Sequence, residues 1–308
     1  MDAHQKKMRD GSYFSGRVIR KIRPVPIFFL CALLASCSRE APPPRERAPV
    51  EPQRIVSLIP AVTEILFAVS AGPRVVGVGT YDVYPPDVKG LTRVGGLIDP
   101  DTERILTLKP DLVFLYGSQE DLISQLSAAG IAVERYRHGG LADVIASIRA
   151  IGTRVGRAAR GEQVASGIEG AVTDVRARAE ARPRPKVLVV FGREEGTLRG
   201  IYASGGIGFI HDMLTAAGGR NVFEDIRREN VQASLESILE RAPEVILEIR
   251  AGPRGPHWPE PQAAAWRAAP SLPAVRNKRV HVLIDERLVV PGPRIAEGLQ
   301  LIERALWK

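Results

Sequence analysis

The sequence predicts an α/β protein made of two Rossmann-like lobes joined by a single long backbone helix. The main observation is a pattern that occurs twice: residues 103–106 and 110–113 read Glu-Arg-Ile-Leu and Pro-Asp-Leu-Val, and residues 236–239 and 243–246 read Glu-Ser-Ile-Leu and Pro-Glu-Val-Ile. Each copy is typical of a short helix, a proline stop and a buried strand. A long helical pattern without proline lies between the copies, where it can join two lobes of one design.

The elements of the first lobe, which we place at residues 53–158, follow in order. A strand at 55–58 leads into a helix that starts at Pro60 and ends near Gly72. Asp99 and Pro100 are the cap and the first-turn proline expected where the helix carrying Glu103 begins. The remaining expectations are strands at 75–78, 112–116 and 131–133, a loop at 81–86 and a helix at 123–129.

The connection and the second lobe complete the fold. Apolar residues recur at helical spacing over 141–181, which predicts one long helix or two in succession, with the connecting helix at 159–183. The second lobe, at 184–308, repeats the strand and helix order from Lys186 and ends with a strand at 280–284, a loop at 285–293 and a helix at 294–306. A rigid helical connector favours modest closure of the lobes over a wide hinge motion.

The N-terminus is typical of an exported lipoprotein. Basic residues precede an apolar run at 27–35 that is too short for a bilayer, which takes roughly 20 residues. Residues 34–37, Leu-Ala-Ser-Cys, match a lipobox, so we expect a signal peptide at 1–36, a lipid anchor on Cys37 and a proline-rich tether at 37–52. An ordinary signal or an amphipathic anchor is the alternative, and initiation falls at Met1 or Met8. The expected location is the periplasm, on the bacterial envelope membrane.

Charge and catalytic motifs exclude several function classes. The leader carries seven Lys/Arg and two Asp/Glu, so it supplies +5 of the net charge of +8, and no nucleic-acid partner is predicted. No serine elbow is present, and the glycine-rich segment 203–208 lacks the lysine of a phosphate-binding loop. No histidines stand at ligand spacing, although a zinc or manganese site of His138, His211 and a carboxylate stays open. We predict no cofactor and no catalytic residue.

Candidate binding residues gather where the strands end. Open α/β sheets bind ligands beyond the carboxyl ends of their strands, so a cleft is expected between the two lobes. Tyrosines are scarce, yet four of them fall at such positions and favour a large, partly apolar ligand over a role as capping residues of the core: Tyr81, Tyr84, Tyr116 and Tyr202. Arg193, Glu286 and Arg287 occupy equivalent loop positions in the second lobe and are the candidates for its polar contacts, with simple solvation of each as the alternative.

Glu103 and Glu236 are the candidates for docking to a partner. A glutamate in the first turn of a helix is stabilised by the helix dipole, by roughly 0.3 to 1 kcal/mol, and this alone could account for one of them. Their recurrence at equivalent places in both lobes favours a docking surface with pseudo-twofold symmetry.

These segments together resemble a known family. The segments that carry the resemblance are 54–64, 81–86, 94–95, 103–113 and 291–294, and they look like the substrate-binding proteins of cobalamin and iron-siderophore ABC importers. The resemblance covers 53–307 and implies two lobes on one backbone helix, that is, a helical-backbone periplasmic binding protein. It also implies that Glu103 and Glu236 pair with arginines of a permease dimer that carries ATPase subunits, and that the protein is a monomer.

Within the family, the chain is most similar to vitamin B12-binding proteins. Tyr81 matches a tyrosine that packs on the corrin, and residues 286–290, including Leu288 and Val290, match a loop of the second lobe that contacts it. The family's cleft tryptophans are replaced by Leu97, Tyr116 and Asn230, and an arginine of the loop by Val290.

Three hypotheses follow for the cleft. The first is delivery of cobalamin or a related corrinoid to an ABC importer. The second keeps the delivery role with a ferric siderophore or haem as the ligand. The third is an exported enzyme that uses the same cleft, which is disfavoured because the candidate residues supply no nucleophile with a base and no metal set.

Overall fold

The computed structural model describes residues 51–252 and 260–307. The predicted signal peptide, Cys37 and the tether up to residue 50 therefore lie outside the described residues. Within the described ranges, no helix combines the length and the apolar character that a membrane span needs.

The first lobe is built on a parallel sheet of five strands in the order β3-β2-β1-β4-β5. The first four of the five residues of β4 are buried, which indicates a strand covered on both faces, as parallel sheets require. The strands are β1 (Ile55–Ser57), β2 (Val75–Val78), β3 (Thr92–Arg93), β4 (Leu112–Tyr116) and β5 (Ala132–Tyr136). The sequence analysis missed β3 and placed the last strand at 131–133.

Helices cover this sheet and differ from the prediction at one cap. The α-helices are α1 (Pro60–Ala68), α2 (Thr102–Thr107) and α3 (Glu120–Ala128), with 3₁₀ turns η1 (Gly72–Arg74) and η2 (Pro86–Gly90). Asp99 is not the cap of α2, and Pro100 is not in its first turn. The carboxylate of Asp101 accepts the Arg104 N–H at 2.9 Å and caps the helix, because α2 begins at Thr102, directly after Asp101.

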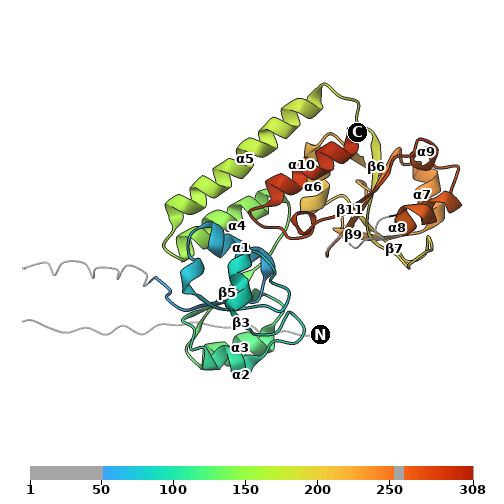
Figure 1. Ribbon diagram of the computed structural model, residues 1–308. Coiled ribbons are helices and arrows are strands. Elements are labelled where there is room, and N and C mark those ends of the chain that lie inside the picture. Colours follow the sequence, from blue (N-terminus) through green and yellow to red (C-terminus); the bar gives the residue numbers. More distant parts are fainter. Residues whose placement is uncertain (1–50, 253–259, 308) are drawn as a thin grey trace, which may run out of the picture. The chain divides into compact units, whose positions relative to one another are not determined.

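The helical pattern at 141–181 corresponds to two helices, which resolves the alternative left by the sequence, and the second of them connects the lobes. They are α4 (Leu141–Arg154) and α5 (Ala158–Glu180), separated at Gly156, whose φ of +68° suits glycine. Gly152 and Gly161 let the helices approach closely, since a Cβ on Gly152 would lie 2.9 Å from the Cα of Gly161. In Figure 1, α5 runs from α4 toward β6 and lies beside the C-terminal helix, to which Arg178 is joined through Glu303.

The second lobe departs from the predicted repeat, because its sheet is mixed. Its order is β11-β10-β6-β7-β9, with β8 beside β6, and β7 is antiparallel to both of its neighbours. The strands are β6 (Lys186–Gly192), β7 (Ile201–Ser204), β8 (Arg220–Asn221), β9 (Asn230–Ala233), β10 (Val245–Arg250) and β11 (Val280–Ile284). The helices are α6 (Phe209–Ala216), α7 (Leu235–Arg241), α8 (Glu260–Ala265), α9 (Pro273–Arg276) and α10 (Ile295–Leu306), with η3 (Trp266–Ala268) and η4 (Glu286–Leu288).

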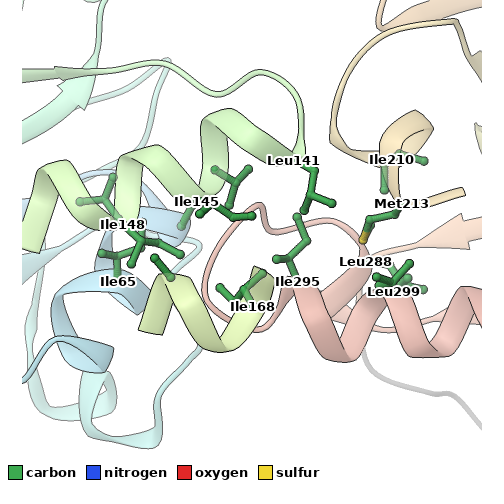
Figure 2. Packing of buried hydrophobic residues seen from close by; sticks show 14 of the residues in the cluster. Ile65, Leu141, Ile145, Ile148, Ile168, Ile210, Met213, Leu288, Ile295 and Leu299 are labelled. Carbon is green, nitrogen blue, oxygen red and sulfur yellow. The ribbon is translucent and has the colours of Figure 1, made fainter. Parts of the chain in front are cut away.

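One hydrophobic cluster connects the two lobes. Figure 2 shows Ile65 of α1, Ile148 of α4 and Ile168 of α5 in the same cluster as Met213 of α6 and Leu299 of α10, all nearly inaccessible to solvent. A shared core resists separation, because opening it would expose apolar surface at about 25 cal/mol per Å². The structure therefore favours small relative motions of the lobes, although the lobe boundaries read from the sequence remain predictions.

Candidate functional site

Aromatic side chains gather at the carboxyl ends of the first sheet. Tyr116 ends β4 and Tyr136 ends β5, and their ring centroids lie 6.2 Å apart in an edge-to-face arrangement. His138 follows β5, with its ring 6.4 Å from each tyrosine. Burial raises the pKa of both tyrosines, so both are neutral phenols at physiological pH. The hydroxyl of Tyr136 donates to the Pro291 carbonyl of the second lobe at 3.4 Å, so this cluster lies where the lobes meet.

Hydrogen bonds from Arg93, one of them to the Asp82 carbonyl, anchor the loop that carries Tyr81 and Tyr84. The Arg93 guanidinium donates to the Gly79 carbonyl at 2.9 Å and to the Asp82 carbonyl at 2.6 Å. The Asp82 side chain is buried, and this burial raises the pKa of its carboxyl to about 6, although Thr63 and Arg93 act in the opposite direction. Neither carboxylate oxygen makes a well-formed hydrogen bond to another described residue. Tyr81, at 75% exposed, therefore projects from a fixed loop.

Tyr84 contacts the second lobe through a charged partner. The guanidinium of Arg294 lies over the Tyr84 ring, 3.8 Å from its centroid. The same guanidinium forms a two-pronged ion pair with Glu64 of α1, with a 2.9 Å bond from Nε. Burial raises the pKa of Glu64, while Arg294 opposes the rise. The motif at 291–294 thus joins the segment at 60–64, and Gly292 fits there because a Cβ would lie 3.2 Å from the Glu64 carboxylate.

A cavity of about 210 Å³ lies between the lobes. His138 comes from the first lobe, and the second lobe contributes two phenylalanines, the loop before α6, the start of β9 and part of the loop after β11. Its lining is mostly apolar, and His138 Nε2 faces the Glu229 carboxylate at 3.9 Å. The lining residues are His138, Phe191, Ser204, Ile207, Gly208, Phe209, Ile210, Glu229, Asn230, Leu288 and Val289. A larger hollow of about 580 Å³ among α4, α5 and α6 contains none of the predicted ligand residues.

The polar candidates of the second lobe are engaged within the protein. The guanidinium of Arg193 is fully buried and donates to Glu248 at 2.6 Å, so it supports the sheet instead of facing a cleft. Arg287 pairs with Asp285 and Glu297, and these carboxylates raise its pKa further. Glu286 accepts the Gly252 N–H at 2.9 Å.

The apolar candidates of the second lobe are placed differently. Leu288 lines the cavity, whereas Val290, which is half-buried, is not among its lining residues. Tyr202 is 52% exposed and pairs with Gly192 in antiparallel register, which brings it to the carboxyl end of β6 although it lies near the start of its own strand.

The glycine-rich loop at 203–208 lines the cavity without offering an anion site. The N–H groups of Gly205 and Gly206 already donate to the carbonyls of Glu229 and Ile226, at 3.0 and 2.8 Å. His211 lies near Asn221, with 3.4 Å between their nitrogens. Across the ranges 51–252 and 260–307, no three His, Cys, Asp or Glu side chains are grouped closely enough to hold a metal ion.

The two docking candidates occupy the same position in their helices. Glu103 and Glu236 are each the second residue of α2 and α7, and both are exposed. Neither glutamate takes part in the hydrogen bonds or ion pairs that organise the cleft.

The sequence analysis missed several cleft residues for identifiable reasons. Tyr136 was assigned no role because its strand was expected to end at residue 133. Phe191 and Phe209 look like core residues, since Phe191 ends an apolar run in β6 and Phe209 stands beside isoleucines at the start of α6. His138 was considered only as a metal ligand, although its place just after a strand was a signal for the cleft. Asn230 was named only as a replacement for a tryptophan.

Comparisons with known proteins fit this geometry. Residues 55–286 match the family model described as "Periplasmic binding protein". The ABC transporter substrate-binding lipoprotein YvrC of Bacillus subtilis is 29% identical over 83% of this chain and 81% of its own length. The vitamin B12-binding protein of Salmonella typhimurium is 31% identical over 63% of this chain and 71% of its own length.

Solved structures share the two-lobed fold. The periplasmic vitamin B12-binding protein BtuF of Vibrio cholerae superposes with a TM-score of 0.69 at 25% identity, covering 83% of this chain and 97% of that one. The periplasmic haem-binding protein RhuT from Roseiflexus, in its apo form, has a TM-score of 0.69 at 28% identity, covering 83% and 98%.

Proposed function

Because the chain belongs to the periplasmic binding protein family, we propose that it is the substrate-binding protein of an ABC importer and that its ligand is cobalamin or a related corrinoid. The observation that carries this proposal is the apolar cavity between the lobes, bordered by stacked and edge-to-face aromatic rings. The family consists of binding proteins, and no covalent step is needed for the function.

The size of the cavity suits one edge of a large ring. Pockets that enclose a drug-sized ligand usually measure about 300 to 1,000 Å³, and this cavity holds about 210 Å³. A macrocycle therefore inserts one edge, and its faces meet tyrosines outside the cavity. Tyr81 and Tyr202 are exposed on different lobes and are proposed to supply these contacts. A rigid loop under Tyr81 reduces the entropy lost on binding.

Haem is the alternative that a specific observation favours. The imidazole of His138 lines the cavity, and histidine is a common axial ligand of haem iron. The carboxylate of Glu229 lies within 3.9 Å of its Nε2, where it can orient the ring as an outer partner of a metal ligand. A ferric siderophore is less favoured, because an anionic chelate calls for available cations, and Arg193, Arg287 and Arg294 are each paired with a carboxylate.

The delivery role needs a membrane anchor and a permease. We propose that Cys37 carries the lipid that holds the protein on the periplasmic side, as the name of the YvrC relative suggests for that protein. Glu103 and Glu236 are proposed to pair with arginines of the two permease subunits, and their matched exposed positions support this. A monomer suffices for this geometry, since one chain carries both glutamates.

A ligand panel tests the proposal. The purified protein is incubated with cyanocobalamin, cobinamide, haemin or a ferric hydroxamate, desalted, and scanned for retained absorbance. We expect the corrinoids to be retained at about one per chain. Retention of haemin alone, with a Soret band that shifts in His138→Ala but not in the control His211→Ala, would replace the corrinoid by haem. Retention of none of the four contradicts both assignments.

A further inference from the structure

The helices that carry Glu103 and Glu236 are duplicated in more detail than the sequence pattern indicates. Each has a side-chain cap: Asp101 accepts the Arg104 N–H, and Ser234 accepts the Ser237 N–H. Each is followed by a non-glycine residue with positive φ, Lys109 at 47° and Ala242 at 48°. These positions lie six residues after the respective glutamate, so the two helices begin, and the chain turns after them, in the same register.

The segment after each of these two helices is also joined to its sheet in the same way. After the proline stop, the Asp111 carboxylate accepts the Arg54 N–H at 3.0 Å, and the Glu244 carboxylate accepts the Lys186 N–H at 2.8 Å. The backbone N–H groups of Asp111 and Glu244 donate to the Arg54 and Lys186 carbonyls in return. The two glutamates therefore lie on two helices that are attached to their sheets rigidly and in equivalent ways.

An exposed leucine accompanies each glutamate at the same spacing. The isoleucine two residues after the glutamate, Ile105 or Ile238, is fully buried and anchors its helix. The next residue, Leu106 or Leu239, is 39% or 38% exposed. Residues three apart on a helix are neighbours, so each leucine lies beside its glutamate.

We propose that Leu106 and Leu239 form, with Glu103 and Glu236, two equivalent docking patches for the two transmembrane subunits of an ABC permease dimer. Each patch is one carboxylate beside one apolar side chain, so each subunit is expected to present a cation at the rim of an apolar depression. The inference rests on the proposed importer function and adds the leucines to the contact.

The duplication is what identifies the partner. A single exposed leucine on a protein surface is ordinary and carries no information. Here the chain presents two leucines of nearly equal exposure, and each follows a glutamate by three residues on a helix that is firmly joined to its sheet. This arrangement matches a partner that presents one surface twice, as a twofold dimer does. An apolar contact beside an ion pair also excludes water from it and strengthens the attraction between the charges.

Photo-crosslinking tests the partner independently of the ligand. A photoreactive phenylalanine analogue is placed at position 106 or 239 of the full-length protein in its native cells, with position 174 on α5 as the exposed control. We expect both docking positions to crosslink to the same polypeptide, identified by mass spectrometry as the transmembrane subunit of an ABC importer, and the control not to. Different polypeptides at the two positions, or none, overturn the proposal.

Substitutions separate the leucines from the glutamates. In cells that lack the native copy, uptake of labelled cyanocobalamin is measured for Leu106→Ser/Leu239→Ser, for the conservative Leu106→Met/Leu239→Met, and for Glu103→Arg/Glu236→Arg. We expect the serine variant to lose at least fivefold of uptake with unchanged cyanocobalamin affinity and unfolding temperature, and the methionine variant to retain uptake. If the arginine variant loses uptake while the serine variant imports normally, the leucines have no role in docking, and the role of the glutamates stands.

The same experiment distinguishes a failure of the function itself. If the parent protein neither binds nor imports cyanocobalamin, the ligand assignment fails, and crosslinking still decides the docking patches. If the parent and all three variants import cyanocobalamin normally, neither the glutamates nor the leucines take part in docking.

Discussion

The two lobes share one half of their design and differ in the other half. In both, a central strand pairs in parallel with the strand that follows the duplicated helix: β1 with β4, and β6 with β10. Around this unit the first lobe adds only parallel strands, whereas the second adds β7, which runs antiparallel to both β6 and β9. The shared half carries the proposed docking helices, and the different half supplies most of the cavity lining.

In the proposed function, this division separates docking and ligand binding within one chain. A symmetric partner needs two equal surfaces, and the parts proposed to face it are alike in the two lobes. A ligand without that symmetry needs unequal walls. The first lobe provides the tyrosines and the histidine at its strand ends, and the second provides phenylalanines, a glycine-rich loop and Asn230. The following changes test where the lobes are equivalent and where they are not.

The largest effect is expected at the buried ion pair of the second lobe. In the shared register, Glu248 of β10 corresponds to Leu115 of β4, since each lies three residues after the strand's first pairing with the central strand. Arg193 and Glu248 are 0% and 1% exposed. Arg193→Met leaves a buried carboxylate without its partner and should lower the free energy of unfolding by about 3 to 5 kcal/mol.

The matched double variant isolates the charge. Arg193→Met/Glu248→Leu gives the second lobe the apolar arrangement that Leu115 has in the first, and it should recover most of the lost stability. Denaturant unfolding of both variants provides the measurement. A double variant as unstable as the single one would mean that the hydrogen bonds of Arg193 to the Glu194 and Thr197 carbonyls matter more than the pair.

A second test concerns the buried carboxyl under the first lobe's tyrosine loop. The pKa of Asp82 is raised to about 6, so the folded state holds a proton that the unfolded state has already lost. The free energy of unfolding should therefore fall as pH rises from about 4 to about 6 and stay lowered above that. Asp82→Asn removes the penalty and should be more stable than the parent by up to about 3 kcal/mol at pH 7.5, and equal to it below pH 4.

The control for this test is the exposed Asp87 in η2. Asp87→Asn should show no gain in stability at pH 7.5 comparable to that of Asp82→Asn, because the exposed side chain of Asp87 is not moved out of water on folding. If the unfolding temperatures of the parent and of Asp82→Asn differ by the same amount at every pH from 4 to 8, burial does not disfavour the charged form of the Asp82 carboxyl.

The sequence predicted the shared half of the lobes better than the half that differs. The repeat of Glu, Pro and apolar strand residues located β4, β10, α2 and α7, because short-range patterns and proline stops act locally. The antiparallel strands were missed, since hydrogen-bond direction depends on distant segments. The pairing of Arg193 with Glu248 and of Arg294 with Glu64 was missed for the same reason: the partners are 55 and 230 residues apart.

Tyr116 lies at the end of β4 as predicted, and Tyr81 and Tyr84 follow β2, but Tyr202 is the second residue of β7 and not at its end. The environments of these tyrosines were not predictable. Tyr81 and Tyr202 are exposed, while Tyr84 is covered on one face by Arg294 and Tyr116 packs on Tyr136. Whether a tyrosine is available to a ligand is decided by neighbours from other strands and from the other lobe, which a pattern along the chain does not record.

Tyr81 and Tyr202, the most exposed of the four predicted tyrosines, give a direct comparison of the lobes as ligand walls. Tyr81→Ala and Tyr202→Ala should each raise the cyanocobalamin dissociation constant severalfold, since a stacked aromatic contributes about 0.5 to 1.5 kcal/mol beyond its buried area. Tyr81→Phe and Tyr202→Phe retain the ring and should bind nearly as the parent does. Titration calorimetry measures all four, and an effect at Tyr81 alone would place the ligand on the first lobe.

The smallest expected effect is at the N-terminus of α4, which both lobes cap together. The Asp143 carboxylate of the first lobe accepts the Gly140 N–H at 2.8 Å, and the Asp212 carboxylate of the second accepts the Leu141 N–H, also at 2.8 Å. Loss of a capping side chain costs about 1 kcal/mol, so Asp143→Ala and Asp212→Ala should lower the free energy of unfolding by similar amounts. Asp212→Asn keeps an acceptor oxygen and should lose less. If Asp212→Ala unfolds like the parent while Asp143→Ala does not, the contact between the lobes contributes nothing to this helix, and the lobes are joined by their other contacts, which include the shared core, the Tyr136–Pro291 hydrogen bond and the Glu64–Arg294 pair.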